Sequence, residues 1–97
     1  MNIYDRIEKA ILRHVMENGR VIEVDGRSMF KMYTVEGLDE LSRRLGFYYP
    51  DFSKVVKEMR QFGRIYYYYD HDLDKYVIIL PISVYQRLSR MHMSEMQ

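Results

Sequence analysis

Apolar residues recur at every fourth position near the start of the chain, a pattern typical of one face of an amphipathic helix. The residues on this face are Ile3, Ile7, Ile11 and Val15, with Ala10 and Leu12 beside them. Asn2 is a suitable N-cap because its side chain can accept a hydrogen bond from a free backbone N–H, and Asn18-Gly19 provides a C-terminal stop. The pattern therefore predicts a long helix between these two points.

Beyond Gly19 the pattern changes to β-branched and apolar residues around the dipeptide Asp25-Gly26. This dipeptide is a strong hairpin signal, because both residue types tolerate the positive φ angles of a tight two-residue turn. We expect strands near Val21–Val24 and Ser28–Tyr33.

Helical spacing returns twice in the middle of the chain. Thr34 can cap a helix through "VEGLDELSRRLG", which ends at Gly46, and Asp51 suits the N-cap of a following helix, which runs up to Gly63. The apolar face of the first helix carries Val35, Leu38, Leu41 and Leu45, and that of the second carries Phe52, Val55, Val56, Met59 and Phe62.

Two runs of high β-propensity then flank "DHDLD", which predicts a second hairpin. Pro81 ends its second strand, and a short helix follows with Val84, Leu88 and Met91 at helical spacing. A five-residue loop pairs Tyr69 with Lys75, and strand alternation then divides the hairpin into two faces. The core-facing set is Ile65, Tyr67, Tyr69, Val77 and Ile79; the outward set is Tyr66, Tyr68, Tyr76 and Ile78.

An exposed aromatic sheet face of this kind is normally covered. The first hairpin, the C-terminal helix and a second subunit are the three candidates for covering it.

Composition limits the class of protein. At 97 residues the chain can bury one modest core, so we expect a single domain over residues 1–97. There are no cysteines, which excludes disulfides, thiolate metal sites and cysteine nucleophiles. No apolar run approaches the roughly 18 to 20 residues that a bilayer span needs, and charges stand where a signal peptide would be apolar. These features predict a cytoplasmic protein.

The net charge of +1 conceals an uneven distribution. Between Arg43 and Arg64, six basic residues stand against Asp51 and Glu58, an excess of four positive charges. The remainder of the chain holds nine basic and twelve acidic residues, an excess of three negative charges. The positive charge is thus concentrated in one segment, where it can attract a polyanion.

The same segment reads "ELSRRLGFYYPDFSKVVKEMRQFGRI", which resembles the helix-turn-helix core of winged-helix DNA-binding domains. In that family a helix ending in Leu-Gly is followed by a short turn, a recognition helix, a glycine with an apolar residue, and a β-hairpin wing. Here Leu45-Gly46 ends the first helix, Phe47 is the apolar plug of the turn, and Gly63-Arg64-Ile65 leads into the wing. The motif covers about a quarter of the chain.

The resemblance implies an α+β fold, a winged helix-turn-helix with a three-helix core and a β-hairpin wing. An extra hairpin between helices 1 and 2 and a C-terminal helix would be additions to it. The helix-turn-helix would occupy about residues 34–62 and the wing about residues 64–80.

The resemblance also implies double-stranded DNA as the partner, with the recognition helix in the major groove. The residues then assigned to DNA binding are Arg43, Arg44, Tyr48, Tyr49, Ser53, Lys54, Lys57 and Arg60. Tyr48 and Tyr49 equally fit a role as plugs of the turn. For the charged residues, the alternative is that they form the solvated faces of two helices.

Three features depart from the family. The connection between the first two helices is long, the turn "FYYP" is aromatic, and the wing tip "DHDLD" is acidic where a wing that contacts DNA is usually basic. The tip begins like a calcium loop, but Lys75 and Pro81 stand where such a loop requires glycine and glutamate. We therefore expect a solvated turn, without a metal or another cofactor.

The function expected from these patterns is a sequence-specific transcriptional regulator, most simply a repressor that occupies an operator. It would act as a homodimer paired through the first and last helices, without a membrane or small-molecule ligand. The alternative is a winged-helix interaction module that binds another protein through the aromatic wing face. We expect no enzyme, because the phosphate-loop, hydrolase and zinc-protease motifs are missing. The small size, the lack of cysteine and the Tyr/Arg-rich composition also resemble winged-helix proteins encoded by archaeal viruses and plasmids.

Overall fold

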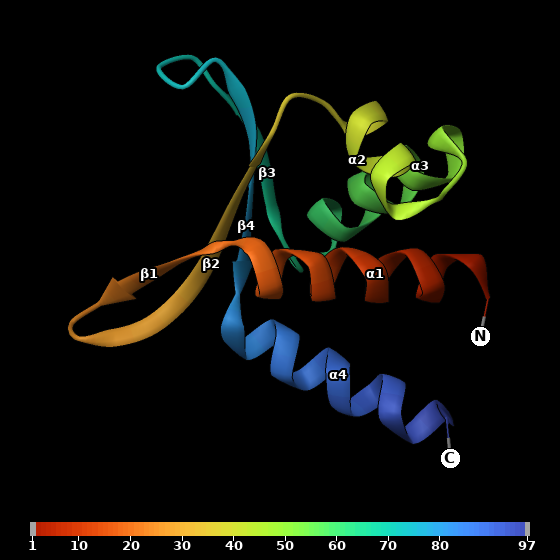
Figure 1. The fold of residues 1–97 in the computed structure, drawn as a ribbon. Helices are drawn as coiled ribbons and strands as arrows, with labels where there is room; N and C mark the ends of the chain where they lie inside the picture. Colours follow the sequence, from red (N-terminus) through yellow and green to blue (C-terminus); the bar gives the residue numbers. More distant parts are fainter. Residues whose placement is uncertain (1, 97) are drawn as a thin grey trace.

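The computed structural model describes the backbone of residues 2–96 and the side chains of residues 2–91 (Figure 1). Within these residues, helices and a four-stranded antiparallel sheet form an α+β fold, as predicted at that level. The elements are α1 (Ile3–Asn18), β1 (Arg20–Val24), β2 (Arg27–Val35), α2 (Leu38–Leu45), α3 (Tyr49–Gln61), β3 (Tyr66–Asp70), β4 (Lys75–Pro81) and α4 (Ile82–Met96).

Helix α1 has the limits that its sequence predicts. The side chain of Asn2 accepts a hydrogen bond from the Asp5 N–H at 2.8 Å, and the Gly19 N–H closes the last turn on the Val15 carbonyl at 2.7 Å. Three members of the predicted apolar face are buried, whereas Ile3 in the first turn is exposed. The helix therefore enters the core one turn after its N-cap.

The sheet has the strand order β1-β2-β4-β3. Asp25 and Gly26 both have positive φ, and they form the predicted turn between β1 and β2. The second strand is longer than expected, because Thr34 pairs with Val77 and continues the ladder to Val35. The prediction that Thr34 caps α2 is therefore wrong: the β-branched threonine extends the strand, and Gly37 stands at the N-cap of a shorter helix.

Helix α3 begins three residues earlier than predicted. Its N-cap is Tyr48, with Pro50 in the first turn, where its fixed φ and missing N–H are tolerated. The prediction that Asp51 is the N-cap is therefore wrong: its carboxylate lies inside the first turn, where the helix dipole favours a negative charge. Phe62 was expected on the buried face, but it follows the last turn and is exposed, with the Arg64 guanidinium 5.8 Å from its ring centre.

The pairing of β3 with β4 is shifted by one residue from the prediction. Asp70 pairs with Lys75 and Tyr69 with Tyr76, because Asp70 belongs to the strand and its carboxylate accepts hydrogen bonds from two N–H groups of a tighter loop.

A shift of one residue in this pairing moves each side chain of the shifted strand to the other face of the sheet. Tyr76 and Ile78, predicted to face outward, therefore lie on the core face, and Val77 and Ile79 join Tyr66 and Tyr68 on the outer face.

The core lies between the helices and one face of the sheet. Phe52 and Met59 of α3 pack there with Ile7 of α1 and with Ile78 and Leu80 of β4. Figure 1 shows α2 and α3 on one side of the strands and α4 alongside α1.

The last helix adds one buried residue to this core. Leu88 is buried and Val84 packs beside it, but Met91, the third residue of the predicted stripe, is exposed. No helix among the described residues has the length and apolar character that a bilayer crossing requires.

Candidate nucleic-acid interface

Helices α2 and α3 are joined by a tight turn with a left-handed glycine. Gly46 has a φ of 84°, and its N–H donates to the carbonyls of Ser42 and Arg43 at 2.9 and 3.2 Å. The next N–H, that of Phe47, also donates to Ser42, at 2.9 Å. This arrangement ends α2 and redirects the chain into α3.

The apolar plug of the turn is Phe47, as predicted. Its half-buried ring packs against the core and lies parallel to that of Phe52, with ring centres 6.3 Å apart. For Tyr48 and Tyr49 the sequence allows two positions, either packed into the turn or facing outward. Both are exposed, Tyr48 at 72%, so they project from the start of α3.

Helix α3 presents a basic stripe to solvent. Lys54, Lys57 and Arg60 are all exposed, and their spacing of three residues places them on neighbouring positions of the helix surface. In the described part of the chain, neither lysine makes a hydrogen bond or an ion pair. Their ammonium groups are thus available to an anionic partner.

Ser53 does not belong to this surface. It was predicted to face outward, but it is only 8% exposed, so that prediction is wrong. Ser53 follows Phe52 directly and precedes Val56 by three residues, which puts it at the edge of the buried face of α3. Contacts of α3 with a binding partner would therefore be made by its longer, exposed side chains.

The two arginines at the end of α2 differ in their engagement. Arg43 makes a long ion pair of 3.7 Å with Asp39, and because both side chains are well exposed this pair contributes little stability. Arg44 is held at both ends of its guanidinium: one nitrogen bonds Glu40 at 2.8 Å and the other donates to the Tyr33 hydroxyl at 2.9 Å. Of the two side chains, that of Arg43 is therefore the more available to bind an anion.

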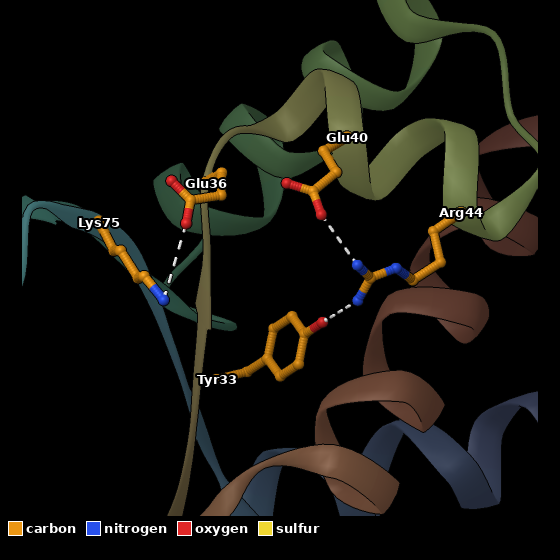
Figure 2. Close-up of polar contacts among 5 residues, drawn as sticks. All are labelled: Tyr33, Glu36, Glu40, Arg44 and Lys75. Atoms are coloured by element: carbon orange, nitrogen blue, oxygen red, sulfur yellow. Dashed lines mark hydrogen bonds and ion pairs between the residues drawn. The ribbon is translucent and has the colours of Figure 1, made fainter.

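Figure 2 shows how Arg44 ties α2 to the sheet. Its guanidinium reaches from α2 to the hydroxyl of Tyr33 on β2. Nearby, Lys75 on β4 forms an ion pair of 3.7 Å with Glu36, just before α2. His14 of α1 packs edge-on against the Tyr33 ring, with centres 4.9 Å apart, and burial together with the Arg44 charge lowers its pKa. These contacts hold α2 against the sheet and the end of α1.

One ion pair at the end of α3 was not predicted from the sequence. Arg64 was counted with the basic residues of the segment, but its guanidinium forms an ion pair with the buried carboxylate of Glu8 and donates to the Tyr4 hydroxyl at 3.4 Å. The sequence feature that could have indicated this ion pair is the position of Glu8 on the apolar side of α1, directly after Ile7 and four residues before Leu12. Arg64 therefore holds α1 to the end of α3 rather than contributing to the basic surface.

The acidic tip of the β3–β4 hairpin is a compact turn. The Asp70 carboxylate accepts from the N–H groups of Asp72 and Leu73 at 2.9 and 3.0 Å, and the Tyr69 hydroxyl donates to Asp74. Among the described residues, no group of three acidic or histidine side chains is arranged to hold a metal ion. The tip is a hydrogen-bonded loop of negative charge.

The outer face of the sheet carries an open apolar groove. Its lining comes from the four strands: Ile22, Phe30, Tyr66, Tyr68 and Ile79. Tyr66 and Tyr68 are exposed, so the first hairpin lies beside them and does not cover them. No helix residue of the described chain lines this groove.

We also compared the whole chain with known proteins. Neither family models nor curated proteins nor solved structures give a match to this chain.

Proposed function

We propose that this chain is a winged-helix protein that binds double-stranded DNA through α3 and regulates transcription, most simply as a repressor. The observation that carries the proposal is the exposed basic stripe of Lys54, Lys57 and Arg60, which follows directly on the tight turn at Gly46. The order of elements supports it, with a strand before α2, a hairpin after α3, and these three strands arranged β2-β4-β3.

The stripe suits a duplex for chemical reasons. Ammonium groups without an internal partner bind phosphates as mobile point charges and also reach the acceptor edge of guanine. Tyr48 and Tyr49 stand at the start of the helix and are exposed, so their hydroxyls can donate hydrogen bonds to the phosphate backbone of the DNA. Arg43 lies at the end of the preceding helix and reaches a neighbouring phosphate once it leaves Asp39. Occupation of an operator by this surface would block access by other proteins.

A DNA titration tests this proposal. Fluorescence anisotropy with a duplex of random sequence, repeated over a range of salt, gives both the affinity and its salt dependence. The double variant Lys54→Ala/Lys57→Ala is expected to bind more weakly and to lower the log–log salt slope by about 2, since each neutralised phosphate contributes about 0.9. Selection of bound sequences from random DNA then gives the operator.

The control is a variant with the same change in charge at another place. Arg20→Ala/Arg27→Ala removes two exposed positive charges from the first hairpin and is expected to leave the salt slope nearly unchanged. Absence of binding by the wild-type protein at low salt contradicts the proposal, as does equal binding by the Lys54→Ala/Lys57→Ala variant.

A second candidate function rests on the apolar groove of the outer sheet face. Tyr66 and Tyr68 project there beside Ile22 and Phe30, a surface that fits a protein partner, and a second copy of the chain is the simplest one. Light scattering is expected to give a dimer for the wild type and a folded monomer for Tyr66→Ser/Tyr68→Ser. A wild-type monomer, or a double variant that stays dimeric, excludes a homodimer through this face.

A further inference from the structure

A row of aromatic rings lies on the core-facing side of the β3–β4 hairpin. Tyr67 stacks on Tyr76 with ring centres 5.6 Å apart and planes 20° apart, and Tyr69 meets Tyr76 edge-on at 5.2 Å. His71 in turn meets Tyr69 edge-on at 4.9 Å. We refer to Tyr67, Tyr69, His71 and Tyr76 as the aromatic row.

The core uses only one end of this row. Tyr67 and Tyr76 are half-buried and pack against the core, whereas Tyr69 and His71 are exposed to solvent. Strand alternation separates the row from Tyr66 and Tyr68, which project from the opposite face. The row therefore runs out of the core and leaves ring surface open at its outer end.

The inner end of the row meets the proposed DNA-binding helix. Burial raises the pKa of Tyr67 to about 12, with smaller contributions in the same direction from Tyr76 and Tyr49 and an opposing one from Arg60. The charge of Arg60 on α3 thus acts on this ring. Arg60 also lines a shallow groove with residues 65–68 at the start of the hairpin. A positive charge therefore lies beside the inner, half-buried ring of the row.

We propose that the aromatic row stacks unpaired bases of a nucleic-acid strand whose phosphate lies on Arg60. The inference rests on the proposed nucleic-acid binding by α3 and adds the kind of DNA that is preferred. Base–aromatic stacking needs a free base face, which a paired duplex hides in its own stack, so a single-stranded extension or an opened duplex is the fitting partner.

The charges set the limits of this site. Arg60 supplies the positive group at the inner end. The three aspartates of the tip, Asp70, Asp72 and Asp74, supply negative charge at the outer end, where Asp74 accepts a hydrogen bond from the Tyr69 hydroxyl. Phosphates are attracted to the first and repelled by the second. A strand would therefore run from α3 along the rings and turn away before the tip.

Two DNA probes test the inference. One is a blunt duplex, and the other is the same duplex with a short single-stranded oligo(dT) extension, both followed by anisotropy at equal salt. The extended probe is expected to bind about tenfold more tightly, in keeping with the stacking of one base on an aromatic side chain. The chain has no tryptophan, so quenching of its tyrosine fluorescence by the extended probe gives a second reading of stacking.

Variants at exposed aromatic residues test the site further. Tyr69→Ala is expected to remove most of the preference for the extended probe, whereas Tyr69→Phe keeps the ring and the preference. Phe62→Ala is the control, because Phe62 is an exposed aromatic residue that lies outside the row and outside the apolar groove of the outer sheet face. Circular dichroism checks that each variant is folded.

The outcomes separate this inference from the proposed function. Equal affinity of the wild type for both probes overturns the stacking site, and so does an equal loss in Phe62→Ala and Tyr69→Ala. In either case, salt-dependent binding of the blunt duplex that requires Lys54 and Lys57 leaves the DNA-binding proposal standing. Failure of the wild type to bind either probe overturns both.

Discussion

Replacing Glu8 with alanine is expected to lower the free energy of unfolding by about 3–5 kcal/mol, the cost of removing one partner from a buried ion pair. The Glu8 side chain is 2% exposed and that of Arg64 is 26% exposed. Without the carboxylate, the guanidinium stays largely out of water and keeps the Tyr4 hydroxyl and the Phe62 ring as neighbours, neither of which carries a compensating charge. Urea denaturation followed by circular dichroism measures the loss.

Two variants show whether the loss comes from the pair. Glu17→Ala removes an exposed carboxylate from the same helix and is expected to change the stability by less than about 0.5 kcal/mol. The double replacement Glu8→Leu/Arg64→Met removes both charges together and is expected to recover much of the loss, since apolar residues of similar volume often replace a buried pair without cost. A Glu8→Ala variant as stable as Glu17→Ala would show that the pair does not stabilise the fold.

The position of this pair gives it a consequence for the proposed DNA surface. Arg64 lies between the end of α3 and the start of β3, and Glu8 lies on α1. The pair thus anchors the junction at which the basic stripe meets the aromatic row. Weakening it is expected to affect the relative placement of α3 and the hairpin as well as the overall stability.

The second large effect is expected at Ile78. Ile78→Ala should destabilise the protein by about 2–5 kcal/mol, because the side chain is completely buried among core residues and its removal leaves a cavity. Ile79→Ala is the matched control, since the same change one residue later falls on the partly exposed outer face. Its cost should be clearly smaller, as measured by chemical denaturation of both variants under one set of conditions.

This pair of variants decides the register of the hairpin. The register with Tyr69 opposite Lys75 puts Ile79 in the core and Ile78 outside, and it reverses the order of the two effects. A larger loss for Ile79→Ala than for Ile78→Ala would therefore contradict the pairing of Tyr67 with Ile78.

Much of the local architecture was predictable because its causes are local. The N-cap at Asn2, the turn at Asp25-Gly26 and the left-handed Gly46 depend on a few adjacent residues, and the structure confirms each of them. The basic stripe was predictable for the same reason, since Lys54 and Lys57 are placed by helical periodicity against the apolar positions of one helix.

Errors in the candidate site arose where a residue stands at a boundary. Ser53 lies at the edge of an apolar face, and a polar residue there becomes buried or exposed according to what packs against it. Thr34 could cap a helix or extend a strand, and its partner Val77, more than forty positions away, decided for the strand. Neither choice has a sufficient signal in the neighbouring residues.

The sequence by itself determined the kinds of element, most of their limits, and the concentration of positive charge between Arg43 and Arg64. The tertiary structure alone decided the register of β3 and β4, the pairing of Glu8 with Arg64, and the tie from Arg44 to Tyr33. These depend on contacts between residues distant in the chain, and a shift of one residue exchanges the two faces of a strand without changing its local pattern. For this reason the tyrosine run could be recognised as a strand from its residues, whereas only the folded chain shows that Tyr67, Tyr69 and Tyr76 form one row.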